Sequence, residues 1–275
     1  MANNKKDEIK VYPPHDIRLS VSKTKSYLAC AAQYKFTYIL KIPKAEVEKD
    51  YLIFGTYLHE ILETFHRYYL EGGQDSYNVV MGRSFKDAAK QYSLKLSSEL
   101  RKEARSIIDS YLRAVSEKTQ PWTHGKVTGV EKDFSIVIND RVLLNGFIDR
   151  LQVDPDGVLH VSDYKSSKSD KYLKNDPFQL LTYAYVLCRE DPTLMKVRAS
   201  YIMLRDNFKW LTKEFDREEI MKMEKVYLDY ADQILSDKLY RANPNFLCRY
   251  CDYLEICGPG LAFAKPNSVF GETKW

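Results

Sequence analysis

The chain has 275 residues, 44% hydrophobic and 29% charged, which is typical of a globular protein with a sizeable core. Its net charge of +4 is a mild basic excess, compatible with a nucleic-acid partner without indicating one. No stretch approaches the ~18 apolar residues of a membrane span, and the N-terminal MANNKKDEIK lacks the apolar segment of a signal peptide. We therefore expect a cytoplasmic protein with no membrane partner.

Helical spacing of apolar residues dominates the first 120 residues. Residues 19–40 predict a strand end followed by a helix that Ser22 caps, with Cys30 near the end of the helix. Residues 55–72 predict a strong helix, because an apolar stripe recurs at helical spacing from Leu58 to Tyr69. Residues 79–118 predict one or two further helices.

The pattern then changes to a period of two residues. Residues 126–139 and 141–154 predict a hairpin that turns at Asn139 and Asp140, and a turn at 154–157 leads into a strand at 157–167. A helix at 176–191, strands at 197–205 and 208–216, and a long amphipathic helix at 217–237 follow. This order predicts one α/β domain with a mixed sheet.

Two acids and a lysine end the central strands. Asp163 and Lys165 lie two residues apart and share a strand face, and Asp149 ends the preceding strand. If these strands pair antiparallel, the two carboxylates lie close and raise each other's pKa unless a cation neutralises them. Such oxygen ligands suit Mg²⁺ or Mn²⁺, and a neighbouring lysine can orient a water or stabilise charge on a phosphate. The pattern indicates metal-assisted phosphodiester hydrolysis, with a surface ion pair as the alternative.

Two helices carry further polar candidates. His59 lies off the apolar stripe of its helix, with Glu63 one turn on, so the pair is no HExxH zinc motif. Gln179 and Tyr183 are spaced four apart on one helix face. Each also has a structural interpretation, His59 as an ordinary helical histidine and the other two as a half-exposed polar pair.

The cysteines favour a metal site over disulfides in a reducing compartment. Cys248, Cys251 and Cys257 have the spacing C-x2-C-x5-C and need a fourth ligand. Cys30 and Cys188 are the remaining cysteines, and Cys188 has the spacing of a core residue on its helix.

Taken together, GTYLHEILE, GFIDRL, DYKSS and QLLTYAY resemble, in order and spacing, the motifs of the RecB-like branch of the PD-(D/E)xK nuclease superfamily over residues 20–260. The resemblance implies a restriction-endonuclease-like core, with a mixed central sheet flanked by helices. We treat residues 1–275 as a single nuclease domain with a helical insertion at 71–120 and a Cys-rich C-terminal tail. Tyr77, Tyr92 and Trp122, in or beside the insertion, either stack bases or belong to the core.

The resemblance also implies roles for the site residues. The implied ligands of Mg²⁺ or Mn²⁺ are His59, Asp149, Asp163 and the carbonyl of Tyr164. Lys165 would position the attacking water, and Gln179 and Tyr183 would steady Lys165 or contact DNA. Glu131 and Glu63 are expected just outside the ligand set. Ser166–Ser167 stand where many relatives carry Thr–Gly.

Segments near both ends of this chain resemble an iron–sulfur subgroup of the same branch. It includes CRISPR-associated RecB-like exonucleases, the AddB nuclease domain and exonuclease V. LSVSKTKSYLACAAQYKF resembles the segment that bears its first ligand, although Ala31 replaces a frequent proline. The resemblance implies a 4Fe–4S cluster held by Cys30, Cys248, Cys251 and Cys257, which joins the tail at 244–260 to Cys30; Zn²⁺ is the alternative.

The expected function is a metal-dependent deoxyribonuclease, an exonuclease acting on single-stranded DNA ends with 5′ to 3′ polarity favoured. Recombination, repair, replication, and phage or CRISPR DNA processing are the expected settings, near the nucleoid or in the host cytoplasm of a phage. The alternatives are a catalytically silent DNA-binding scaffold and a structure-specific flap endonuclease. No G-x-x-x-x-G-K-[ST] phosphate loop is present, so a helicase or recombination partner is expected, and a homo-oligomer is a further option.

Overall fold

The computed structural model describes residues 12–44 and 50–264. Its strands are β1 (Ile17–Leu19), β2 (Lys126–Ile138), β3 (Val142–Val153), β4 (Leu159–Lys165), β5 (Lys196–Met203) and β6 (Lys209–Asp216). Its helices are α1 (Val21–Ala29), α2 (Ala31–Tyr34), α3 (Asp50–Leu70), α4 (Tyr77–Tyr92), α5 (Ser98–Glu117), α6 (Phe178–Glu190), α7 (Arg217–Met221), α8 (Met223–Ser236) and α9 (Gly258–Ala264). A helix that spans a bilayer needs about 20 mostly apolar residues, and none in these ranges meets that requirement.

The strands form one mixed sheet in the order β1-β3-β4-β5-β6, with β2 paired to β3. β3 and β4 pair antiparallel, β4 and β5 parallel, and β5 and β6 antiparallel. The parallel pair requires a crossover, which α6 supplies between β4 and β5. The predicted mixed α/β architecture is therefore confirmed.

The chain divides into two compact units. One comprises residues 46–134 and 147–223, and the other comprises residues 1–45, 135–146 and 224–275. The predicted insertion at 71–120 contains α4 and α5, which belong to the first of these units. Its description as an insertion into a single domain stays a prediction.

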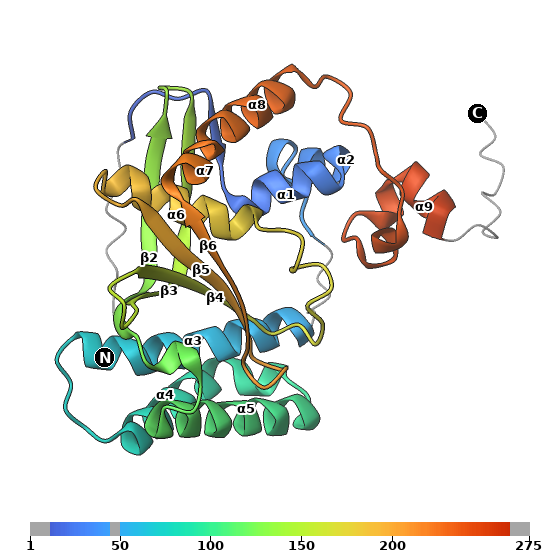
Figure 1. Cartoon of the computed structure of the whole chain (residues 1–275). Helices are drawn as coiled ribbons and strands as arrows, with labels where there is room; N and C mark the ends of the chain where they lie inside the picture. The colour runs from blue at the N-terminus through green and yellow to red at the C-terminus, as the bar shows by residue number, and fades with distance from the viewer. Residues whose placement is uncertain (1–11, 45–49, 265–275) are drawn as a thin grey trace. The chain divides into compact units, whose positions relative to one another are not determined.

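In the unit formed by 46–134 and 147–223, the sheet lies between α6 and the group formed by α3, α4 and α5 (Figure 1). Tyr164 on β4 and Ile202 on β5 join the apolar cluster built by α3, α4 and α5. Asp163 and Tyr201, one residue before each of them, lie on the opposite face because side chains alternate along a strand. There the hydroxyl of Tyr183 on α6 donates to Asp163 Oδ1 at 3.4 Å. Asp163 and Lys165 of β4 thus face α6.

In the second unit, described residues before β2 and after α7 contact the tip of the β2–β3 hairpin or one another. β1 pairs in parallel with β3 through Ile17 and Val142. Arg141, beside the hairpin turn, forms ion pairs with Asp16 and with Asp232 on α8. The Tyr27 hydroxyl on α1 donates to Asp237 Oδ2 at 3.0 Å, just beyond α8. Strand pairing thus joins residues 125 positions apart, and the Tyr27–Asp237 hydrogen bond joins residues 210 positions apart.

The structure confirms the predicted hairpin turn but contradicts two predictions about helices. The hairpin turn is confirmed, with positive φ values at Asn139 (47°) and Asp140 (52°), residue types that tolerate this conformation. The predicted helix cap was wrong: Ser20, not Ser22, caps α1, since its side chain accepts from the Lys23 amide at 3.2 Å. The single helix predicted at 217–237 is two helices, α7 and α8.

A buried histidine connects β4 to β5 at the base of the sheet. His160 is fully buried, with Nδ1 at 2.7 Å from Asp154 Oδ2 and Nε2 at 2.6 Å from Ser200 Oγ. The ring stacks on Trp210 at a centroid distance of 4.7 Å. Burial lowers the pKa of His160 to about 4, and the attraction of Asp154 only partly opposes this shift.

This depressed pKa predicts a loss of stability in mild acid. Above the ordinary histidine pKa of about 6.5, His160 is neutral in both states; between about pH 6.5 and 4 the unfolded chain takes up a proton that the folded chain does not. We expect the free energy of unfolding to fall by about 3 kcal/mol, because of His160, as the pH is lowered from about 6.5 to 4. Urea unfolding at pH 7.5, 6, 5 and 4 measures it, with His160→Gln expected to show a shallower decline. Equal declines in both proteins would contradict the prediction.

Candidate active site

The antiparallel pairing of β3 and β4 brings their acids together. Arg150 is opposite Ser162 in the register, so Asp149 and Asp163 lie one position beyond on the paired strands. The amide of Tyr164 donates to Asp149 Oδ2 at 2.8 Å, which fixes one carboxylate against the neighbouring strand. The predicted proximity of Asp149 and Asp163 is present in the structure, but Asp149 lies within β3 and not at its end as predicted.

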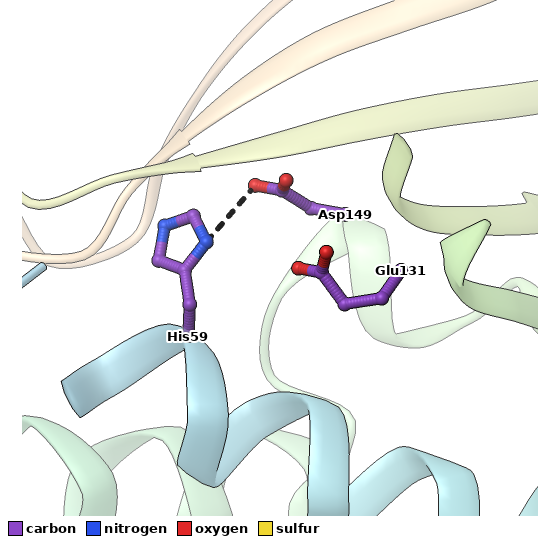
Figure 2. Close-up of side chains that lie close together, drawn as sticks. All are labelled: His59, Glu131 and Asp149. Atoms are coloured by element: carbon purple, nitrogen blue, oxygen red, sulfur yellow. Dashed lines mark ion pairs between the residues drawn. The ribbon is translucent and has the colours of Figure 1, made fainter. Parts of the chain in front are cut away.

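Three side chains from three elements form a possible metal site, shown in Figure 2. His59 on α3, Glu131 on β2 and Asp149 on β3 each offer one ligand atom, and these atoms all lie within 4.8 Å of one another. His59 Nδ1 is 3.4 Å from Asp149 Oδ2. One imidazole and two carboxylates are a donor set that suits Mn²⁺ or Mg²⁺.

Glu131 reaches this group because the backbone of β2 is distorted at that residue. Its φ of 44° is in the left-handed region, which a residue with a long side chain seldom adopts within a strand. Such strained positions tend to occur where a side chain is aimed at a functional site. The sequence analysis expected Glu131 only outside the ligand set, and its strand pattern contains no signal of the distortion.

Without a bound cation, burial and mutual repulsion disfavour the charged forms of the Asp149 and Glu131 carboxylates. Burial raises the pKa of Asp149 well above its ordinary value, and the neighbouring charges of Asp163 and Glu131 raise it further. Burial also raises the pKa of Glu131, with Glu63 as the next cause. A bound cation would offset both the burial and the repulsion, so the residues fit a divalent ion.

Lys165 lies on the face of the sheet that packs on α6, where neighbouring polar side chains position its ammonium. Its Nζ lies 2.6 Å from Asp163 Oδ2 and donates to Gln179 Oε1 at 2.9 Å. Gln179 Nε2 in turn donates to Asp163 Oδ1 at 2.6 Å and to the Tyr183 hydroxyl at 2.8 Å. The ammonium is also 5.2 Å from the centre of the Tyr201 ring. Gln179 thus connects the lysine, the acid and the tyrosine that the sequence singled out.

Tyr164 contributes its backbone to the site and its side chain to the core. Its carbonyl oxygen is 3.0 Å from His59 Nε2. Its hydroxyl is buried on the other face of the sheet, 2.8 Å from the Tyr111 hydroxyl and 3.2 Å from Arg150 Nη1. This anchoring restricts the main chain between Asp163 and Lys165.

Asp163 and Glu63 take positions outside the group of three. The oxygens of Asp163 face Lys165 and Gln179, and its role as a metal ligand stays a prediction. Glu63 forms an ion pair with Arg67 one turn along α3.

Gly55 on α3 lies close to the loop that follows Lys165. A Cβ at position 55 would lie 3.0 Å from Ser166 Oγ. Its lack of a side chain lets α3 approach that loop.

The four predicted cluster cysteines line one small cavity in the second unit, which includes residues 135–146. Cys30, Cys248, Cys251 and Cys257 line a space of about 40 Å³. Burial raises the pKa of the Cys251 thiol, and the other three cysteines add to this shift. Backbone amides of Asn243 and Asn245 donate to the sulfurs of Cys30 and Cys248, both at 3.4 Å. Cys188 is instead buried on α6, as its spacing predicted.

Comparisons with known proteins identify the family and the fold of the chain. The sequence model of the PD-(D/E)XK nuclease superfamily matches residues 18–258. An ATP-dependent helicase/deoxyribonuclease subunit of Streptococcus agalactiae is 25% identical over 239 residues, covering 80% of this chain and 21% of the relative. The protein of the same name from Streptococcus pyogenes is 25% identical over 249 residues, covering 86% and 22%. The chain thus spans about a fifth of the length of these relatives.

A solved structure supports the fold alone. A protein from Eubacterium rectale, described as a candidate exonuclease, superposes with a TM-score of 0.52 at 13% identity and covers 87% of each chain. The six-stranded mixed sheet with flanking helices is the restriction-endonuclease-like fold that the sequence analysis expected. On the match over residues 18–258, this chain belongs to the PD-(D/E)XK nuclease superfamily.

Proposed function

We propose that the chain is a metal-dependent deoxyribonuclease that degrades single-stranded DNA from an end, with 5′ to 3′ polarity favoured. The observation that carries the proposal is the juxtaposition of His59, Glu131 and Asp149 with the lysine side chain on the adjoining strand. Nucleases of this superfamily use divalent metal ions, and the donor set fits one. DNA as substrate is supported by the relatives, whose name includes deoxyribonuclease.

The protein's own groups have distinct tasks in this proposal. His59, Glu131, Asp149 and the Tyr164 carbonyl would hold Mg²⁺ or Mn²⁺, with Asp163 as a further ligand. When bound, the ion supplies a Lewis acid and lowers the pKa of a coordinated water. Lys165, positioned by Gln179 and Asp163, orients the attacking water and stabilises charge that develops on the phosphate. Tyr183 fixes Gln179 in turn.

A cleavage assay on linear and circular single-stranded DNA, with separate 5′ and 3′ labels, tests the proposal. We expect Mg²⁺- or Mn²⁺-dependent loss of the linear substrate only, with the 5′ label released first, and no reaction in EDTA. Cutting of circles or of a flap junction would replace the exonuclease by an endonuclease with the same chemistry. Metal binding without any cleavage of DNA would contradict the proposed activity and favour the scaffold alternative.

We further propose a 4Fe–4S cluster on Cys30, Cys248, Cys251 and Cys257, with a structural role. The four cysteines line one cavity, so a single metal group could bind them together. Zn²⁺ is the alternative occupant of such a four-cysteine site. The backbone of Gly260 lies close to the cysteine sulfurs, since a Cβ at this position would lie 3.2 Å from Cys257 Sγ.

Replacement of Cys248 by alanine is expected to abolish the brown colour of the purified protein and most of its soluble yield, because the cluster joins distant parts of the chain. The matched control is Cys188→Ala, which should keep the colour. Iron, acid-labile sulfide and zinc are measured in both. Stoichiometric zinc without sulfide in the wild type would show that the site is a zinc site instead.

A helicase partner is also proposed, since the relatives are subunits named helicase/deoxyribonuclease and the nuclease-like segment is a fifth of their length. The setting would be recombination or a related step of DNA processing, in the cytoplasm. Co-purification of the tagged chain with an ATPase that stimulates its cleavage of duplex ends would support this partnership.

A further inference from the structure

A second cavity in the unit formed by 46–134 and 147–223 has no role in the proposed chemistry. It has a volume of about 390 Å³ and lies between α3, α5 and the start of β2. None of the three grouped ligand residues lines it. Its volume falls within the ~300–1,000 Å³ that is usual for small-molecule sites.

The wall of the cavity contains a buried cation without an acidic partner. Arg150 is 2% exposed. Its guanidinium donates to neutral groups: Nε to Gln152 Oε1 at 3.0 Å, Nη1 to the Tyr111 hydroxyl at 2.8 Å, and Nη2 to the Trp122 carbonyl at 3.1 Å. Among the described residues no carboxylate lies within ion-pair distance, and Nη2 has a second N–H for another acceptor. A buried charge of this kind favours an anionic ligand.

The rim adds positive charge from two other segments. Lys118, just after α5, and Lys126, at the start of β2, line the cavity and are exposed. Neither forms an ion pair within the part of the chain that the structure describes, and none of the thirteen lining residues is acidic. His66, Thr123 and His124 complete the polar lining. The lining therefore combines cationic side chains with no acidic side chain of its own, an arrangement that favours an anionic ligand.

The remaining wall is aromatic. Phe65, Tyr69 and Tyr77 contact one another, with ring centroids 5.1–5.8 Å apart in edge-on arrangements. Tyr77 is 42% exposed, so part of its ring is free to contact a ligand. Such a surface suits a planar ring, which a simple anion lacks. Trp122, by contrast, is fully buried and belongs to the core.

We propose that this cavity binds a phosphorylated nucleoside, with the phosphate toward Arg150 and the two lysines and the base against Tyr77. The ligand is either a free mononucleotide or the terminal nucleotide of a strand, which share this chemistry. The binding site stands on its own lining and does not require the proposed cleavage.

Calorimetric titration with deoxyadenosine 5′-monophosphate in EDTA tests the proposal, because EDTA removes the metal and with it any cleavage. The rim variant is Lys118→Ala with Lys126→Ala. The control is Lys213→Ala with Lys222→Ala, which removes the same charge from exposed positions on β6 and between α7 and α8. We expect at least ten-fold weaker binding in the rim variant and less than a two-fold change in the control, with unfolding temperatures alike.

Two further titrations define the ligand. Tyr77→Ala should weaken deoxyadenosine monophosphate binding while leaving that of inorganic phosphate unchanged. Competition by oligothymidylate with a terminal phosphate would identify a strand end, and competition by the free nucleotide alone would identify a mononucleotide site. Absence of nucleotide binding, equal weakening in rim and control variants, or equal competition by an unphosphorylated oligonucleotide would each overturn the proposal. None of these results bears on metal-dependent cleavage, which the labelled-DNA assay measures separately.

Discussion

Replacement of Lys165 by alanine is expected to lower the rate of DNA cleavage by about 10²–10⁴-fold, the range typical for loss of one positioned catalytic group. The ammonium is 2.6 Å from Asp163 Oδ2 and is held by Gln179, so its position is set before substrate arrives. The lysine is partly exposed, with a quarter of its side chain accessible, so its removal should leave the fold intact. Single-turnover cleavage with saturating Mg²⁺ measures the change.

The matched control is Lys171→Ala, an exposed lysine in the connection between β4 and α6. It should cleave at nearly the wild-type rate and bind DNA as the wild type does. DNA binding by the Lys165 variant, measured by fluorescence anisotropy in Ca²⁺, should also be nearly unchanged. Cleavage by the Lys165 variant at the wild-type rate would exclude Lys165 from the mechanism. Loss of DNA binding by this variant would show that Lys165 contributes to substrate binding and not specifically to the chemical step.

Asp149→Asn should abolish metal binding and yet stabilise the metal-free protein. The carboxylate is buried and faces the charges of Asp163 and Glu131, so the folded state carries an unfavourable charge that asparagine removes. The asparagine oxygen can still accept from the Tyr164 amide. We expect the unfolding temperature in EDTA to rise by about 2–4 °C, the shift that about 1 kcal/mol produces in a chain of this size.

The same variant should show no rise in unfolding temperature on addition of Mn²⁺, whereas the wild type should be stabilised in proportion to its occupancy. Glu131→Gln should behave likewise if it is a ligand, because its charge is similarly buried. Asp133→Asn, two residues along β2, serves as the control and should retain the response to Mn²⁺. A full Mn²⁺ response in the Asp149 variant would exclude Asp149 from the ligand set.

Much of the site could be predicted because its residues repeat local patterns. The alternation along residues 157–167 places Asp163 and Lys165 on one strand face, and helical spacing places Gln179 and Tyr183 on one helix face. A short turn between two strands then implies antiparallel pairing, which brings Asp149 beside them. These inferences need only the geometry of single elements and their nearest connection.

The sequence by itself determined the α/β class, the strand and helix order and the motif residues, because side-chain periodicity and turn chemistry act over a few positions. Only the tertiary structure decided that Glu131 joins His59 and Asp149, since this depends on a left-handed residue within β2. It also decided that Arg150 forms a cavity wall with residues from α3 and α5. Spacing along a chain states which side chains share a face, but the packing of separate elements decides which faces meet.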